Sequence, residues 1–440
     1  FTGQPHHMLQ INNILNDGLR LAEVRVTGNA VPTPDFAAYR RDLSTVPGIP
    51  AGATQTPAFL NVLGAGFDVP RTFKADLAYQ RRLGTRASLG AALQYARTTN
   101  LYHYYDRNLP AQPAFRLANE PTASGEGRAV FVPLDSIPAT NPAGAGALTR
   151  LTWADPSFAR VLELRGDAFA DQRALILDGS VRLWRDAFVQ ASYTYNRTRD
   201  NSSYNCCIAV TASFTPVASD PRDLSGSWGP SNTDFRHKMV VFGVLPSFWG
   251  IRIAPRYVGL SGTPFSAMVA GDVNGDDPNN NNDLAMVFDP AAPGVDPTVA
   301  AAMRRVLDNP DNVARDYLRA NLGRVASRNG AANPFFGRLD VRVSRSVATV
   351  RGQKAELTLD VFNLANLYGR WLDRLDPQEG GAPRNFGAQE IVPAANQALL
   401  SIRGFDRANR RYVYGVNERF GQTIKQGDPY QIQLGVRYGF

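Results

Sequence analysis

Strict alternation of apolar and polar residues recurs along this 440-residue chain and constrains its fold more than any other feature. The clearest case is the C-terminal segment QIQLGVRYGF, residues 431–440. Successive side chains of a β-strand point to opposite faces, so this segment predicts a strand with one apolar and one polar face. Aromatic residues on the apolar face, up to the final position, are typical of a strand that crosses a membrane in a barrel.

Similar alternation occurs in further segments, each close to the length that crosses a membrane at a tilt. We expect strands within residues 73–80, 88–95, 175–183, 189–196, 234–245, 251–257, 338–347 and 354–363. With the terminal segment they make about nine strands. The pattern of residues 234–245 does not indicate which face would meet lipid. The sequence contains no apolar run of 18 or more residues, which argues against a helical membrane protein.

The connections between these segments alternate in length. Short turns are expected near Gly84, at Asp186, near Trp249 and at residues 351–353, and long connections at about 99–171, 199–234, 262–334 and 366–427. Outer-membrane barrels have short turns on the periplasmic side and long loops outside. The sequence therefore predicts an all-β protein, a transmembrane antiparallel β-barrel with long extracellular loops.

The domain organisation follows from the same segments. Residues 1–70 are rich in Pro, Gly and Ala and are expected to form an outer loop with a strand near Leu19–Val26; residues 71–440 carry the barrel. Within the loops, residues 297–322 predict two helices broken at Pro310, and residues 399–420 predict a hairpin. The start, FTGQPHHML, lacks the basic and apolar regions of a signal peptide.

An odd number of antiparallel strands leaves the first and last parallel. Such a sheet cannot close by the usual antiparallel pairing, and an open edge in lipid is costly. We therefore expect this chain to be the C-terminal part of a larger barrel.

Several stretches over about residues 70–440 resemble the C-terminal barrel of TonB-dependent outer-membrane receptors of the Oar-like group. They are DFRHKMVVFG, GTPFSAMVAGDVNGDDPNNNNDLAMVFDP, RLDVRVSRSV, LTLDVFNLANLY, IRGFDRANRRYVYGVNERFG and QLGVRYGF. Full-length members of that group begin with a carboxypeptidase-regulatory-like domain. The resemblance implies a 22-stranded barrel, a plug domain, and a TonB box that binds the TonB complex. It also implies energised import of a large, scarce solute. No plug, TonB box or N-terminal domain is visible in the sequence.

The C-terminus also resembles the signal recognised by the barrel-assembly machinery. Leu434, Tyr438 and Phe440 match its alternating apolar and aromatic positions. The same residues are equally expected as plain lipid-facing side chains, and both interpretations can hold together.

The loop GDVNGDDPNNNND is a candidate calcium site. Asp272, Asn274 and Asp276 occupy positions 1, 3 and 5 of a calcium-type loop, and Asp283 occupies position 12. Oxygen ligands at alternate positions can surround a calcium ion. The loop departs from the pattern at position 6, which is Asp277 instead of Gly, and in its last ligand, an Asp instead of Glu. The alternative is a polar loop rich in turn formers. No other cofactor is indicated.

The polar faces of the strands predict a charged lumen and solute path, with no catalytic residues. The candidate lining residues are Arg252, Arg256, Arg338, Asp340, Arg342, Glu356 and Arg437. The GxSxG, HExxH and P-loop signatures of enzymes are absent. The adjacent Cys206 and Cys207 could form a vicinal disulfide or stay free, but they make no disulfide framework and no zinc site.

The formal charge of +8 bears on partners. Arginines are scattered rather than clustered, which argues against nucleic acid. An anionic glycolipid leaflet, such as outer-membrane lipopolysaccharide, or an anionic solute suits the charge better. We expect a receptor or transporter for an unknown solute. The alternatives are a passive porin-like or adhesive barrel, an outer-membrane hydrolase, and a soluble β protein.

Overall fold

The computed structural model describes most of the chain. The described residues are 24–25, 28, 31, 33–48, 54–55, 57–122, 125–140, 145–184, 186–203, 221, 223–276, 282–348, 353–376, 386–427 and 429–439. The pair Cys206 and Cys207, the terminal Phe440 and most of the expected strand at Leu19–Val26 lie outside them. Two residues of that expected strand form β1 (Val24–Arg25), which pairs with β2 (Thr54–Gln55).

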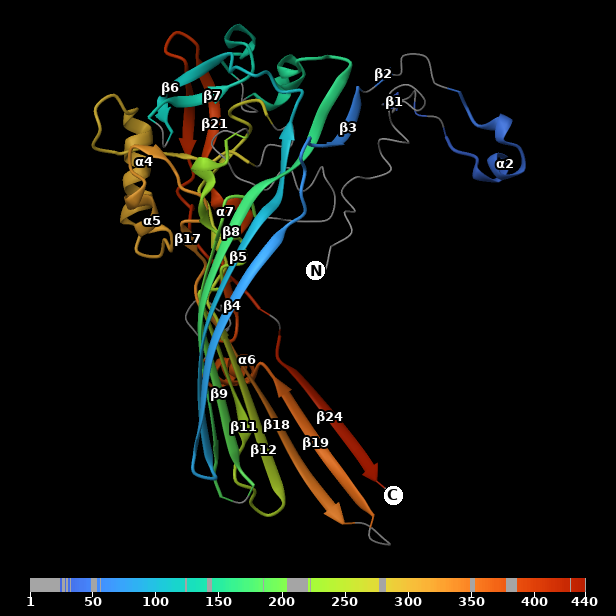
Figure 1. The fold of residues 1–440 in the computed structure, drawn as a ribbon, viewed down its shortest axis with the longest axis vertical. Helices are drawn as coiled ribbons and strands as arrows, with labels where there is room; N and C mark the ends of the chain where they lie inside the picture. The colour runs from blue at the N-terminus through green and yellow to red at the C-terminus, as the bar shows by residue number, and fades with distance from the viewer. Residues whose placement is uncertain are drawn as a thin grey trace.

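A long curved sheet forms the main body of the molecule (Figure 1). Its path contains nine strands in the order β24-β19-β18-β12-β11-β9-β8-β5-β4, and every neighbouring pair is antiparallel. Their bounds are β4 Arg71–Leu83, β5 Ala87–Asp106, β8 Phe158–Arg182, β9 Phe188–Asp200, β11 His237–Val244, β12 Ile251–Leu260, β18 Phe336–Ala348, β19 Lys354–Phe362 and β24 Gln431–Gly439. Off this path, β3 (Ala58–Leu63) pairs parallel with β8, and β10 (Gly229–Pro230) pairs with β9.

Short turns lie at one end of the sheet and long connections at the other, as the sequence indicated (Figure 1). The short turns contain residues with left-handed backbone, among them Gly84 at φ 62° and Asp186 at φ 62°. Glycine adopts this conformation without steric cost, and aspartate tolerates it better than most residues. These residues let the chain reverse within a few positions, which keeps that end of the sheet compact.

Two strands extend far beyond the length that a membrane requires. β5 has 20 residues and β8 has 25. The sequence predicted a long connection from about residue 99 to 171, whereas the paired strands continue to Asp106 and resume at Phe158. Tyr104, Leu162 and Leu164 are buried there in a small cluster, so the extension is stabilised by packing that the sequence pattern alone does not reveal.

The register of the strands gives the sheet one apolar and one polar face. Leu77 pairs with Leu93, Leu93 with Leu175, and Leu175 with Tyr195, so these side chains share one face across four strands. At the other edge of the sheet, Leu434 is 79% exposed on the same face. A band of exposed large apolar side chains spanning a whole sheet is what a lipid-facing surface requires.

Register also resolves the strand whose pattern was ambiguous. In β11, Met239 pairs with Tyr193 and lies on the apolar face, whereas Lys238 and Phe242 lie on the polar face. The sequence gives no clear alternation here because Phe242 and its neighbours place apolar side chains on the polar face as well.

At the long-loop end, the described residues within 107–157, 261–335 and 386–426 pack into a folded unit, here called the loop domain (Figure 1). Its strands are β6 Phe115–Pro121, β7 Gly127–Val130, β13 Pro264–Phe265, β14 Met268–Ala270, β15 Met286–Val287, β16 Arg324–Val325, β17 Ala331–Ala332, β20 Gln389–Ile391, β21 Ala398–Asp406, β22 Arg411–Val416 and β23 Ile424–Gln426. Its α-helices are α4 Pro297–Asp308, α5 Arg315–Ala320 and α7 Ala394–Gln397. The two helices and the hairpin β21–β22 lie where the sequence predicted them.

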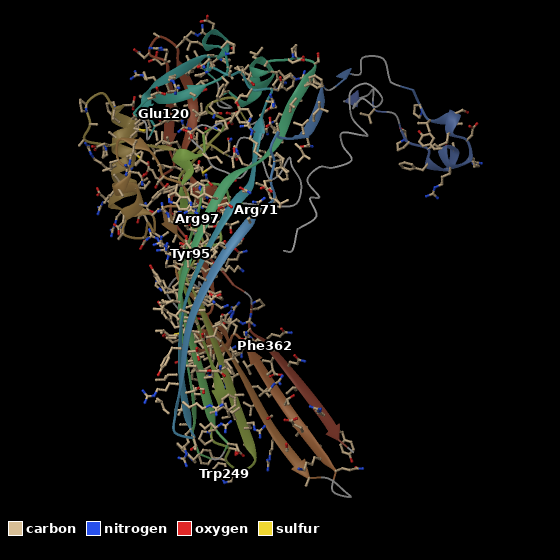
Figure 2. All side chains as sticks on the ribbon, viewed as in Figure 1. Arg71, Tyr95, Arg97, Glu120, Trp249 and Phe362 are labelled. Atoms are coloured by element: carbon tan, nitrogen blue, oxygen red, sulfur yellow. The ribbon has the colours of Figure 1, made fainter. Side chains whose placement is uncertain are left out.

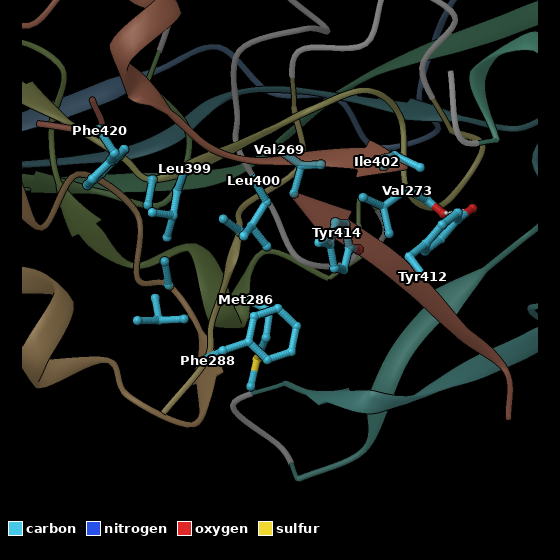
Figure 3. Close-up of a cluster of buried hydrophobic side chains, with 14 of the residues drawn as sticks. Val269, Val273, Met286, Phe288, Leu399, Leu400, Ile402, Tyr412, Tyr414 and Phe420 are labelled. Atoms are coloured by element: carbon cyan, nitrogen blue, oxygen red, sulfur yellow. Dashed lines mark hydrogen bonds between the residues drawn. The ribbon is translucent and has the colours of Figure 1, made fainter. Parts of the chain in front are cut away.

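A shared hydrophobic core holds the loop domain together. Figure 3 shows part of it, including Val269, Met286, Leu400, Ile402 and Tyr414, which belong to one cluster of buried side chains. Because these residues come from strands and loops far apart in the sequence, the loops form one structure rather than independent excursions.

The remaining helical segments are short or lie outside the loop domain. They are α2 Phe36–Arg41, α6 Leu364–Leu375 and the 3₁₀ turns Leu43–Thr45, Leu134–Ser136, Gly146–Thr152 and Ser225–Ser227. None of the helices in the described part of the chain has the length and hydrophobicity needed to cross a membrane.

The sheet is open at both edges within the described residues. β4 pairs only with β5, and β24 pairs only with β19. Since all neighbouring strands of the nine-strand path are antiparallel, β4 and β24 run in the same direction.

Candidate solute path and outer pocket

The polar face of the sheet gathers the seven residues proposed to line a solute path. Register places Arg256 opposite Asp340, and Glu356 opposite Arg437, on one common face. The others, Arg252, Arg338 and Arg342, occupy alternate positions of the same strands and share that face. The seven residues thus lie on adjacent strands, on the side opposite the apolar band.

Some of these charges are neutralised by their neighbours. Arg342 donates through Nε and Nη2 to the two carboxylate oxygens of Asp360, at 2.6 and 3.0 Å. Arg338 donates to Asp340 at 2.9 Å, and the same Asp340 oxygen accepts the backbone N–H of Asn363 at 2.9 Å. Such charge-assisted bonds fix the side chains in place. These pairs therefore hold the side chains of the polar face in place, and they leave little unpaired charge at Arg338 and Arg342.

Other arginines of the set have no acidic partner among the described residues. Within the described residues, Arg252, Arg256 and Arg437 make no ion pair within 4.0 Å. Unpaired guanidinium groups on a wet surface attract anions and form bidentate hydrogen bonds with carboxylate or phosphate. The polar face is thus a positively biased surface crossed by fixed ion pairs.

A buried ionic cluster ties the loop domain together. The Arg128 side chain is fully buried and lies 2.9 Å from Glu120 and 2.9 Å from Asp283. Glu120 also accepts the hydroxyl hydrogen of Tyr414 at 2.5 Å. Burial alone would lower the pKa of Arg128, but its two carboxylate partners raise it above the ordinary value, so the guanidinium stays charged. The sequence did not predict this cluster, because Asp283 and Tyr414 lie far along the chain from Glu120 and Arg128.

The candidate calcium loop lies beside this cluster. Asp272 and Asn274 are fully buried, and Asp276 and Asp283 are nearly so. Asp272 accepts backbone N–H groups from Asn274 and Gly275 at 3.1 and 2.6 Å, as in a turn stabilised by an aspartate. Burial and the nearby Asp283 raise the pKa of Asp276 to about 6. The loop therefore concentrates negative charge away from water.

These residues fit a calcium ion in part. Carboxylate and amide oxygens are the donors that calcium prefers, and the buried Oδ1 of Asn282 has no hydrogen-bond partner among the residues that the structure describes. Among the described residues, however, no group of three acidic, histidine or cysteine side chains converges as metal ligands. Residues 277–281 of the same loop lie outside the description. Calcium stays a prediction of the sequence.

A cavity of about 770 Å³ opens between α4, β15 and β22 in the loop domain. It is lined by Asn119, Pro121, Met286, Phe288, Asp289, Ala292, Pro293, Gly294, Val295, Asp296, Pro297, Thr298, Val299, Gly323, Arg411, Tyr412, Val413 and Tyr414. Most of these side chains are apolar, and Asp289, Asp296 and Arg411 contribute charge. A pocket of this size, with apolar walls and a few polar groups, is typical of a small-molecule site.

The sequence held only a weak signal for this pocket. Asp296 caps α4 by accepting the backbone N–H groups of Thr298 and Val299, at 2.8 and 3.2 Å. The Asp-Pro pair at 296–297 marks this helix start in the sequence. The opposite wall comes from the hairpin β21–β22, and its approach to α4 is a tertiary contact without a local motif.

One protein-family model agrees with this architecture. The family model of the outer membrane beta barrel domain matches residues 20–369, well over half of the chain. Among solved structures, the outer membrane transporter YddB from Escherichia coli aligns with a TM-score of 0.38 and 9% identity. The alignment covers 71% of this chain and 31% of that transporter, so the chain spans less than a third of its length. No curated protein matches the sequence. The chain therefore belongs to the outer membrane beta barrel domain family and resides in the outer membrane.

Proposed function

We propose that the chain is part of the barrel of a TonB-dependent outer-membrane receptor of the Oar-like group. This receptor binds a large, scarce solute at its outer loops and imports it through a plugged lumen. The observation that carries the proposal is the folded loop domain, with its own core and a pocket of about 770 Å³, above a polar sheet face. A passive pore needs no preformed pocket outside the membrane, whereas a receptor needs one to capture a dilute solute.

The open edges of the sheet support the proposal that the barrel is larger than this chain. β4 and β24 run parallel and are each paired on one side only among the described residues. In lipid, unpaired backbone groups cost several kcal/mol each. Further strands of the same protein, up to the 22 that the resemblance implies, would satisfy these edges. A plug and a TonB box would lie outside the present chain, and the barrel-assembly machinery would insert the whole barrel.

The ion pairs of the polar face favour transport over hydrolysis. Asp360 and Asp340 are each held by an arginine, Arg342 and Arg338. A carboxylate that is fixed in such a pair is a weak base and a poor nucleophile. We accordingly propose no catalytic role for the chain.

Single-channel recordings of the full-length protein in planar bilayers test this function. A plugged receptor gives no steady conductance until the plug is unfolded with urea, after which large conductance steps appear. A passive porin conducts without urea, and that result would overturn the proposal. An adhesive barrel would give no conductance under either condition and would likewise contradict it.

The pocket itself can be tested with a matched pair of variants. Val413 lines the cavity, whereas Val313 lies between α4 and α5 and is exposed to a similar degree, 39% against 48%. Spent growth medium is dialysed against each purified protein, and the retained small molecules are identified by mass spectrometry. We expect Val413→Trp to lose a solute that the wild type and Val313→Trp retain. Equal retention by both variants would exclude this cavity as the binding site.

A further inference from the structure

The apolar face of the sheet carries unpaired arginines at its outer edge. Arg97 lies on β5, Arg173 on β8 and Arg197 on β9; these three are called the outer-rim arginines. Arg173 pairs with Tyr95 on one side and Arg197 on the other, in the same alternate positions as Leu93 and Leu175. All three are exposed, and their side chains make no hydrogen bond or ion pair within the described residues.

The position of the outer-rim arginines along the strands matches the outer boundary of the membrane. In Figure 2, Arg97 and Tyr95 lie on the sheet near the lower end of the loop domain, and Trp249 lies at the opposite end of the sheet. Arg97 is about ten residues beyond Ala87, the start of β5 after its short turn. Ten residues rise about 33 Å along a strand, or about 25 Å across the membrane at a tilt of about 40°. The outer-rim arginines therefore lie where outer-leaflet headgroups begin.

A groove on the lipid-facing surface leads down from these arginines. It encloses about 460 Å³ and is lined by Ala75, Asp76, Leu77, Leu93, Gln94, Tyr95, Arg173, Ala174, Leu175 and Tyr195. The side chains of Leu77, Leu93 and Leu175 lie along its apolar part, and Arg173 lies at its outer end next to Tyr95. The groove thus combines an apolar channel with a cationic end, which is the pattern of a lipid with an anionic headgroup.

Around the outer-rim arginines, positively charged side chains outnumber negatively charged ones. Among the described strand residues, Asp171 pairs in register with Arg97 and Arg199 and is the carboxylate next to the outer-rim arginines on this face. The guanidinium of Arg199 packs 4.9 Å from the centre of the Trp228 ring. Arg71, on β4, is already paired with Asp68 at 2.5 Å. One carboxylate cannot neutralise three arginines, and exposed cations beside lipid are costly unless anionic headgroups accompany them.

We propose that the outer-rim arginines and the groove below them bind a phosphorylated glycolipid of the outer leaflet, of the lipid A type. The phosphates are held by Arg97, Arg173 and Arg197, and acyl chains lie along the three leucines. Guanidinium groups suit this role because their planar donors match phosphate oxygens in bidentate geometry. Tyr95 and Tyr195 contribute amphipathic side chains at the boundary between headgroup and chain.

The test uses two double variants with the same loss of charge on the same face. Arg173→Gln with Arg197→Gln removes two outer-rim arginines. Arg81→Gln with Arg345→Gln removes two exposed arginines of the apolar face near the short-turn end. Full-length protein in neutral maltoside micelles is titrated with diphosphoryl lipid A, and bound lipid is counted by native mass spectrometry. We expect about 25-fold weaker binding for the first variant, from about a fivefold loss per arginine, and unchanged binding for the second.

Two further titrations keep the proposal falsifiable if a variant does not fold. Wild-type protein should bind dephosphorylated lipid A at least tenfold more weakly than the diphosphoryl form, and millimolar inorganic phosphate should not compete. Equal losses in both double variants would show diffuse charge instead of a site. Equal binding of the two lipids, or full competition by free phosphate, would also overturn the proposal.

Discussion

Replacing Arg128 with methionine is expected to destabilise the loop domain by about 3–5 kcal/mol. The Arg128 side chain is fully buried between Glu120 and Asp283, each 2.9 Å away. Methionine preserves much of the side-chain volume but leaves both carboxylates without their buried counter-charge. The expected loss arises from this uncompensated charge, since a buried ion pair as a whole contributes little net stability.

A second ion pair in the same domain provides the control. Arg305 on α4 donates to both carboxylate oxygens of Glu418, at 2.8 and 2.7 Å, so its geometry is at least as good. Both side chains are about half exposed, at 56% and 47%. Water and salt screen such a pair, and Arg305→Met is expected to cost no more than about 1 kcal/mol.

The assay measures urea-dependent cleavage of the loop domain by a brief protease pulse, in full-length protein held in detergent. Heat-dependent migration on gels reports separately whether the barrel remains folded.

The loss of unfolding free energy caused by Arg128→Met should also shrink as the pH falls from 8 to 5. Burial raises the pKa of Asp283, and removal of Arg128 takes away a charge that lowers it. A carboxyl with a raised folded pKa loses its stabilising contribution as the pH rises through that value. Equal costs for the Arg128 and Arg305 variants would refute this reasoning.

Other predictions concern the buried loop and the faces of the sheet. In calcium-free buffer, Asp276→Asn should remove a loss of loop-domain stability that develops as the pH rises from about 4 to 7, worth up to about 3 kcal/mol. Its basis is that burial and Asp283 raise the pKa of Asp276 to about 6, so ionisation at higher pH opposes folding. Calcium should bind the loop that begins at Asp272 and give heat in a calorimetric titration where magnesium gives little; absence of calcium binding would end that prediction. Leu434→Arg, on the apolar face, should cost about 2–4 kcal/mol in urea unfolding. The adjacent Gln433→Arg, on the polar face, should cost far less, and equal costs would contradict the assignment of faces.

Much of the membrane sheet is predictable because its signal is local. Alternation in β24 or β19 needs only neighbouring residues, and both strands appear where the alternation indicated them. In β11 the signal failed, since Phe242 is apolar on the polar face, and only pairing with β9 and β12 decides its orientation. The extension of β5 to Asp106 depends on burial against other segments, which no local pattern reports.

Helix α6 was not predicted from the sequence, although the sequence contains a local pattern that indicates a helix. Leu364, Leu367, Tyr368, Trp371 and Leu375 recur at helical spacing within LANLYGRWLDRL, directly after a strand. The Arg128 cluster and the pocket carried no such signal. Arg128 and Asp283 meet only when the loop domain folds, so their proximity is a property of tertiary structure.

The most direct test of the account is spin labelling along β8. Cys206 and Cys207 are first replaced with serine, and single cysteines are then introduced at each position from residue 173 to 182 for labelling in lipid bilayers. We predict that accessibility alternates with a period of two. Labels at Leu175, Leu177 and the other odd positions meet lipid-soluble oxygen, and labels at even positions such as Asp178 meet a water-soluble nickel chelate. If the nickel chelate reached both sets equally, the strand would not lie in a membrane and the central claim would be wrong.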